Sequence, residues 1–167
     1  TGAIGMAGVH WEYSGEAGPD HWAELTPEFA LCGAGRMQSP IDLGTPSAEA
    51  HVEVVAGYRS GPLDVVNNGH TVQVNFQRGS RLVSSGDAYD LLQMHFHTPA
   101  EHAVSGKRYP LVAHFVHRDA SGQLAVLGVF FEEGAANPEL EKIITHVPHN
   151  AHGAAQASDV RFDPDNM

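Results

Sequence analysis

Three histidines, His95, His97 and His114, are the residues whose types and spacing first suggest chemistry. Side chains two apart in a β-strand share a face, so the stretch "HFH" places two imidazoles together. Residues 110–118 have the pattern of the next strand, and antiparallel pairing sets His95 opposite His114 and His97 opposite Val112. Three imidazoles then meet on one sheet face and leave a fourth position for water, which is the arrangement of a catalytic zinc site.

The spacing alone fits two interpretations, a metal site or histidines that merely occupy strand positions. Gln93 favours the metal site, because it lies on the same predicted face as His95 and could accept the other ring N–H. The same alternation puts Leu91 on this face, and it puts Met94 on the opposite one.

The elements that must position these residues are predicted to be mainly strands. Short blocks alternate apolar and polar residues between Gly and Asn, at 51–58, 62–69, 70–76 and 81–97. Residues 109–119 and 124–134 form a predicted hairpin, whose second arm is apolar enough for a central strand.

The ends of the chain show weaker patterns. Residues 1–50 predict an irregular arm pinned by aromatic side chains, with a helical turn at 20–25. Residues 137–147 predict a short amphipathic helix. Residues 156–167 show no packing pattern. We see no linker, and therefore expect a single domain over residues 1–167, mainly β.

Composition narrows the class of protein. The 167 residues carry a net charge of −11 with nine scattered Lys and Arg, which argues against nucleic acid or an anionic membrane as partner. No apolar run is long enough to span a bilayer, and the N-terminus does not resemble a retained signal peptide. The single Cys32 is either a buried thiol or one half of a disulfide to another chain.

Five stretches in this order resemble a known family. They are "SPIDL" (39–43), "NNGHTVQVNF" (67–76), "QMHFHTPAEH" (93–102), "AHFVH" (113–117) and "LAVLGVFFEEG" (124–134). Together they closely resemble the α-class carbonic anhydrases, bacterial members in particular. The resemblance implies a central, twisted, mostly antiparallel sheet with short peripheral helices. It also implies that His95, His97 and His114 bind Zn²⁺ at the base of a cleft.

The resemblance implies a reaction as well, the reversible hydration of CO2 to bicarbonate and a proton by zinc-bound hydroxide. Zinc lowers the pKa of its water to about 7, a value known for carbonic anhydrases themselves. His70 matches the position that passes the proton to solvent. Glu101 matches the acidic residue that accepts a hydrogen bond from a threonine beside the hydroxide.

Further positions match the walls of the family's cleft. Asn68, Gln73 and Tyr13 match polar residues that order water, whereas Val116 and Val126 match the apolar wall where CO2 lies. Sulfonamides and anions would bind at the zinc. From the residues alone, each of these five cleft positions also fits a plain surface or packing role. His102 and His117 are interpreted as structural, and Pro148 argues against a second metal site built from His146, His149 and His152.

The sequence departs from the family in two ways. Val112 stands where the family has a glutamate that holds the third imidazole, so we expect weakened zinc binding. The chain also stops before the family's last strands, whose Leu-Thr-Thr-Pro-Pro-Cys loop supplies the threonine for Glu101 and a cysteine that would pair with Cys32.

Three hypotheses therefore stay open. The first is a zinc carbonic anhydrase, periplasmic or secreted by resemblance and by the implied disulfide. The second is a non-catalytic or weakly active zinc-binding or interaction domain. The third is a fragment with exposed edge strands, which swaps, dimerises or needs a companion C-terminal segment.

Overall fold

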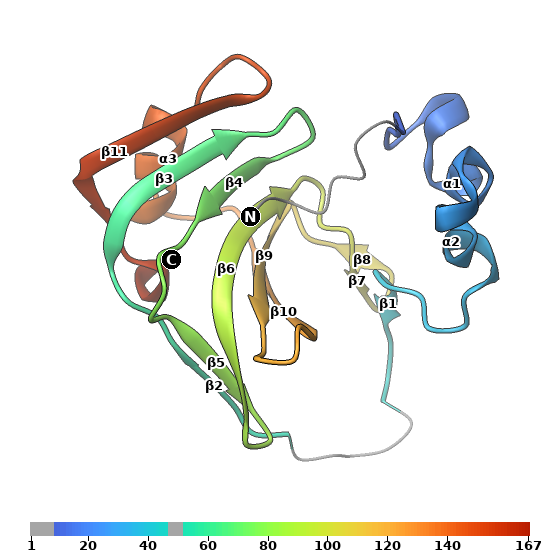
Figure 1. The fold of residues 1–167 in the computed structure, drawn as a ribbon, viewed down its shortest axis with the longest axis horizontal. Helices are drawn as coiled ribbons and strands as arrows, with labels where there is room; N and C mark the ends of the chain where they lie inside the picture. Colours follow the sequence, from blue (N-terminus) through green and yellow to red (C-terminus); the bar gives the residue numbers. More distant parts are fainter. Residues whose placement is uncertain (1–8, 47–51) are drawn as a thin grey trace. The chain divides into compact units, whose positions relative to one another are not determined.

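The computed structural model describes residues 9–46 and 52–167, in two compact units over residues 1–41 and 42–167 (Figure 1). The expectation of one domain over residues 1–167 stays a prediction. None of the described helices is long and apolar enough to cross a membrane.

The first unit is an arm of short helical turns around aromatic side chains. The indole Nε1 of Trp22 donates to the carbonyls of Glu12 at 3.1 Å and Ala17 at 3.0 Å, and its ring meets Trp11 and Tyr13 edge-on. The predicted turn at 20–25 is confirmed, and the predicted arm over 1–50 is confirmed for residues 9–41, since residues 1–8 and 47–50 lie outside the described residues and residues 42–43 form a strand. The turns are η1 (Gly15–Ala17), η2 (Pro19–His21), α1 (Trp22–Leu25), η3 (Pro27–Phe29) and α2 (Leu31–Ala34).

The second unit is built on an eight-stranded antiparallel sheet, so the predicted mainly-β fold is confirmed. Its strands are β2 (Val54–Gly57), β3 (Gly61–Asn67), β4 (Val72–Asn75), β5 (Arg81–Ser84), β6 (Asp87–His97), β9 (Leu111–Arg118), β10 (Leu124–Phe131) and β11 (Gly153–Phe162). They run in the order β10-β9-β6-β4-β3-β11, and the β2–β5 pair joins β6. A small second sheet holds β1 (Asp42–Leu43), β7 (Ala103–Val104) and β8 (Lys107–Arg108).

Strand β6 is the long central strand on which the sheet is organised (Figure 1). Its first half pairs with β5 and its second half with β4, while β9 lies along its other edge. A bulge between Leu91 and Gln93 shifts the alternation by one residue. Leu91 therefore enters the hydrophobic core with Met94, which corrects the prediction that it shares a face with Gln93.

The core lies between the sheet and the helix α3 (Pro138–His146). Leu63, Val65 and Phe162 are at most 2% exposed, and Ile143 of α3 packs into the same cluster. The predicted helix is confirmed. It begins where the Asn137 side-chain oxygen accepts from the backbone N–H groups of residues 139 and 140, a standard N-terminal cap.

Two expectations about strands were wrong. Residues 153–162 form strand β11 and pair with β3, although residues 156–167 were predicted to have no packing pattern. Small alanines and a bulge between Ala157 and Arg161 hide the alternation that would have shown it. Strand β10, expected to be central, lies at the edge of the described sheet, and none of its residues is fully buried, so its apolar composition did not reveal the number of its neighbouring strands.

His117 is structural, as predicted, and is fully buried beneath β10. Burial lowers its pKa, so the ring is neutral at neutral pH. Its Nδ1 lies 3.3 Å from the Ala125 carbonyl and therefore donates, while its Nε2 accepts from the Tyr58 hydroxyl at 3.0 Å. Burial in turn raises the pKa of Tyr58, which keeps that hydroxyl protonated as a donor.

Substituting Tyr58→Phe is expected to lower the free energy of unfolding by about 1–3 kcal/mol, because Nε2 of His117 is then buried without a partner. Urea denaturation measures the change. Tyr89→Phe is the matched control, since the Tyr89 hydroxyl makes no hydrogen bond within the described residues. Equal small losses in both variants would contradict the assigned role of Tyr58.

Candidate metal centre

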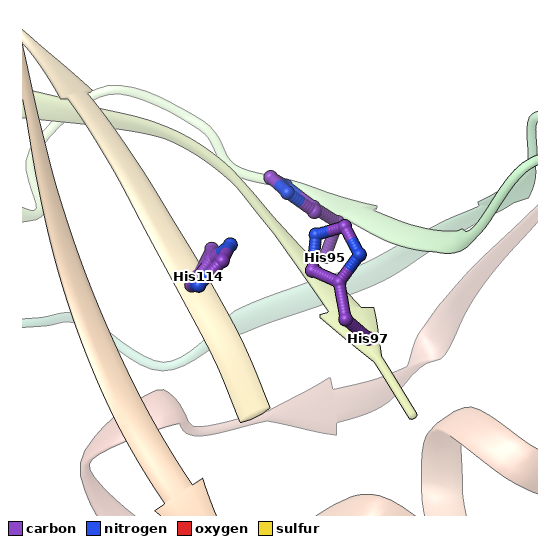
Figure 2. Close-up of side chains that lie close together, drawn as sticks. All are labelled: His95, His97 and His114. Atoms are coloured by element: carbon purple, nitrogen blue, oxygen red, sulfur yellow. The ribbon is translucent and has the colours of Figure 1, made fainter. Parts of the chain in front are cut away.

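Strands β6 and β9 bring three imidazoles together, as the sequence predicted. His95 pairs directly with His114, and His97 pairs with Val112. One ligand nitrogen from each of the three histidines lies within 4.8 Å of the other two. Figure 2 shows that His95 and His97 come from one strand and His114 from its neighbour, with the rings turned toward a shared space.

The imidazole rings of His95 and His114 differ in their hydrogen-bond partners. The Nδ1 of His95 lies 2.8 Å from the Gln93 side-chain oxygen, so this hydrogen bond leaves Nε2 of His95 as the lone-pair donor. The Nδ1 of His114 faces Glu101, while its Nε2 is, among the described residues, the one buried side-chain polar atom without a hydrogen-bond partner. Val112, two residues earlier and fully buried, offers no acceptor.

All three imidazoles are poised to be neutral near pH 7. Burial lowers the pKa of His95 to about 4, with smaller effects from the neighbouring His97 and His114. Burial also lowers the pKa of His97 and is the largest cause of the lowered pKa of His114. A neutral imidazole keeps a lone pair for a metal, whereas a protonated one has none.

Glu101 is the carboxylate nearest to this cluster. Its Oε2 lies 3.2 Å from Nε2 of His97 and 3.7 Å from Nδ1 of His114. Because burial lowers the pKa of His97, the shorter contact joins a neutral ring to the carboxylate and is not an ion pair. Glu101 is therefore placed to accept a hydrogen bond from a group bound beside the three histidines.

The donor set fits zinc. Three neutral imidazoles on paired strands match the three-histidine ligand set of catalytic zinc sites, and one of them, His114, is buried with a nitrogen that makes no hydrogen bond within the described residues. His95, His97 and His114 would hold the ion. Among the described residues no other group of His, Cys, Asp or Glu converges in this way, and His146, His149 and His152 do not.

Comparison with known proteins agrees with this geometry. The family model of the eukaryotic-type carbonic anhydrases matches residues 17–167. The chain belongs to this family. A solved carbonic anhydrase from Thermovibrio ammonificans, in complex with sulfanilamide, is 44% identical and superposes with a TM-score of 0.90 over 96% of this chain and 71% of that one.

Two bacterial carbonic anhydrases show the extent of the match. The protein of Pectobacterium atrosepticum is 42% identical over 153 residues, which cover 92% of this chain and 62% of the relative. That of Nostoc sp. is 44% identical over 160 residues, which cover 93% and 61%. The chain thus spans about three-fifths of the length of the curated carbonic anhydrases that it matches.

His70 lies in the exposed turn between β3 and β4. Hydrogen bonds within this turn hold the backbone of His70. The Asn68 side-chain oxygen accepts from the backbone N–H groups of His70 at 3.0 Å and Thr71 at 2.9 Å. Asn68 therefore shapes this turn, a role the sequence did not predict.

Thr71 ties the same turn to the metal-binding strand. Its hydroxyl donates to the Phe96 carbonyl at 2.5 Å and accepts from the Phe96 N–H at 3.2 Å. Phe96 stands between His95 and His97, so Thr71 anchors the turn that bears His70 directly to strand β6, which carries these two histidines. Sequence reasoning missed this residue, because a threonine after "NGH" gives no signal of its long-range partner.

The structure places some of the remaining predicted cleft residues on the strands that carry the three histidines or on strands paired with them. Gln73 pairs with His95 across β4 and β6, and Val116 pairs with Val126 across β9 and β10. Tyr13 packs against Trp11 in the first unit, and its place relative to the cluster is not described. Cys32 is an exposed thiol on α2 rather than a buried one.

The contact between Gln93 and His95 predicts an effect on metal affinity. Gln93→Leu removes the acceptor for Nδ1 and is expected to weaken zinc binding by about 10–100-fold. Gln93→Glu keeps an acceptor and should bind zinc at least as tightly as the unmodified protein. Competition with a chromophoric chelator measures both. Equal affinities of the Leu variant and the unmodified chain would contradict the role of Gln93.

The unpartnered nitrogen of His114 predicts the opposite effect. Val112→Glu supplies an acceptor and is expected to tighten zinc binding by about 10–100-fold. Val112→Leu, which adds bulk without an acceptor, is the control and should not tighten it. The same competition assay applies, with thermal unfolding as a check on folding. A folded Glu variant with unchanged affinity would show that His114 needs no acceptor.

Proposed function

We propose that this protein catalyses the zinc-dependent, reversible hydration of CO2 to bicarbonate and a proton. The observation that carries the proposal is the convergence of three neutral imidazoles on paired strands β6 and β9, in a chain that belongs to the carbonic anhydrase family. The chain spans about three-fifths of its relatives, so the activity is proposed for it rather than taken from them.

Each residue of the centre has a part in this chemistry. A zinc ion held by the three histidines would supply Lewis acidity that lowers the pKa of water to about 7, a value known for carbonic anhydrases themselves. Gln93 fixes the ring of His95. Glu101, the carboxylate nearest to the three histidines, accepts a hydrogen bond from the attacking group and so orients it. Val116 and Val126 provide the apolar wall against which CO2 lies.

His70 moves the product proton to solvent. Imidazole is the side chain suited to proton transfer near neutral pH, and His70 is exposed at the rim of the turn that Thr71 anchors to β6. Asn68 supports this role, because its side chain holds the backbone N–H of His70. Asn68 and Gln73 further order the water between the metal and His70, and Tyr13 is proposed to join them.

A second candidate is a zinc-binding domain of weak or no activity. The unpartnered Nε2 of His114 favours it, because a ligand ring without an outer partner binds metal less tightly. On this reading a companion C-terminal segment, joined through the exposed Cys32 or held in a dimer, completes the site.

We propose a location for the protein from its resemblance to bacterial carbonic anhydrases and from the disulfide expected at Cys32. We place it in the periplasm or outside the cell, where a disulfide at Cys32 would persist. Sulfonamides and small anions are expected to bind at the zinc, since a relative has been solved with sulfanilamide.

Stopped-flow measurement of CO2 hydration tests the proposal. The zinc-loaded chain is expected to be active, to lose activity with a chelator and to recover it with zinc. His95→Ala, which removes one ligand, should bind zinc weakly and hydrate no CO2 above the uncatalysed rate. Stoichiometric zinc without activity in the folded chain would favour the second candidate. Activity that survives chelation would contradict both.

The role of His70 has its own test. His70→Ala is expected to lower kcat for CO2 hydration by about tenfold or more in dilute buffer, because proton transfer then limits turnover. Added imidazole should restore the rate, while kcat/KM and zinc affinity stay unchanged. His149→Ala is the control, as an exposed histidine outside the turn. An unchanged kcat in His70→Ala would show that the proton leaves by another route.

A further inference from the structure

A small cavity lies away from the zinc-binding face, where three connections of the second unit meet. Its volume is about 170 Å³, and it is lined by residues before and at the start of β3, residues between β4 and β5, and the last residue of β11. The rings of Phe76 and Phe162, 6.1 Å apart, form its apolar floor. Near the C-terminus in Figure 1, the start of β3 and the end of β4 converge at this corner.

Two exposed arginines, Arg59 and Arg78, are among the residues that line the cavity. Neither arginine forms an ion pair within the described part of the chain. Arg161, next to the cavity, donates its Nε and Nη2 hydrogens to Ser60 and no hydrogen to a carboxylate. Asp165, a carboxylate at this corner, accepts from the Tyr58 backbone N–H at 3.3 Å. The corner is thus locally cationic in a protein with a net charge of −11.

The backbone positions Arg59 for this arrangement. Gly79 has φ of +123°, and a Cβ there would lie 3.3 Å from Nη1 and 3.4 Å from Cδ of Arg59. The arginine side chain therefore lies across the bare glycine backbone. Its own N–H donates to the Ser80 hydroxyl oxygen at 2.9 Å, which fixes the other end of the residue.

Ser80 supplies a further donor at the cavity. It is only 3% exposed, and its hydroxyl oxygen accepts from Arg59. Within the described residues its hydroxyl hydrogen has no acceptor. Buried hydrogen-bond donors normally have an acceptor. We therefore expect a molecule bound in the cavity that Ser80 lines to accept the hydrogen bond of its hydroxyl.

We propose that this cavity binds a small oxyanion. Planar guanidinium groups bind phosphate and carboxylate oxygens in pairs, and the Ser80 hydroxyl would donate to a further oxygen. The cavity is large enough to admit an anion of the size of phosphate, sulfate or bicarbonate. The site is separate from the zinc centre and does not depend on the proposed CO2 chemistry.

Calorimetric titration of inorganic phosphate into the zinc-loaded chain tests the proposal, with sulfate and bicarbonate as parallel arms that rank the anions. The zinc-free chain is expected to bind one anion per chain, and the zinc-loaded chain should show the same site in addition to any binding at the zinc. Arg59→Gln and Arg78→Gln should each weaken the Kd by at least about tenfold. Arg118→Gln, which removes an equally exposed and unpaired charge outside the cavity, should not.

Several results would overturn the proposal. These are no saturable binding of any of the three anions at millimolar concentration, an equal response to chloride at the same ionic strength, equal weakening in Arg118→Gln, or loss of the site when zinc is removed. Because the unmodified chain and the zinc-free chain are both measured, failure of this site is distinguishable from failure of the CO2 hydration activity.

Discussion

The pairing of β6 with β9 is the constraint on which the rest of the centre depends. A shift of one residue would turn every side chain of one strand to the other face of the sheet, and His114 would then enter the core. The observed register instead sets His95 directly against His114. Core residues on the opposite face, Met94 against Phe115 and Phe96 against Ala113, reinforce this register because they bury apolar surface only when it holds.

Burial of the three imidazole rings has two opposite effects on their ability to bind a metal. Burial keeps them neutral, which frees lone pairs for a metal at neutral pH. Burial also makes each ring's second nitrogen costly to leave unpartnered. Gln93 meets this need for His95, whereas nothing described meets it for His114. The fold therefore orients the ring of His95 by a hydrogen bond, whereas the ring of His114 on the neighbouring strand lacks such a bond at Nε2.

Much of this centre could be predicted from the sequence because it follows local rules. The alternation of strands gave the shared face of His95 and His97, and the short connection to residues 110–118 gave an antiparallel register. Gln93 was found for the same reason. The zinc-ligand role and the family both rested on the motifs around these residues.

Other features could not be predicted, and each failure has a physical cause. The bulge before Gln93 moved Leu91 into the core, and no local signal marks a bulge of this kind. Strand β11 was missed because alanines carry little pattern and because its partner, β3, lies far back in the sequence. Thr71 was missed because its bond to Phe96 is a long-range contact.

The central claim is that three imidazoles of this chain bind one zinc ion. X-ray absorption at the zinc edge, on the purified chain reconstituted with one equivalent of zinc, tests it most directly. The account predicts a four-coordinate ion with three imidazole nitrogens at about 2.0–2.1 Å and one oxygen. A spectrum with fewer than three imidazoles, or zinc that washes off without reaching one equivalent per chain, would contradict it.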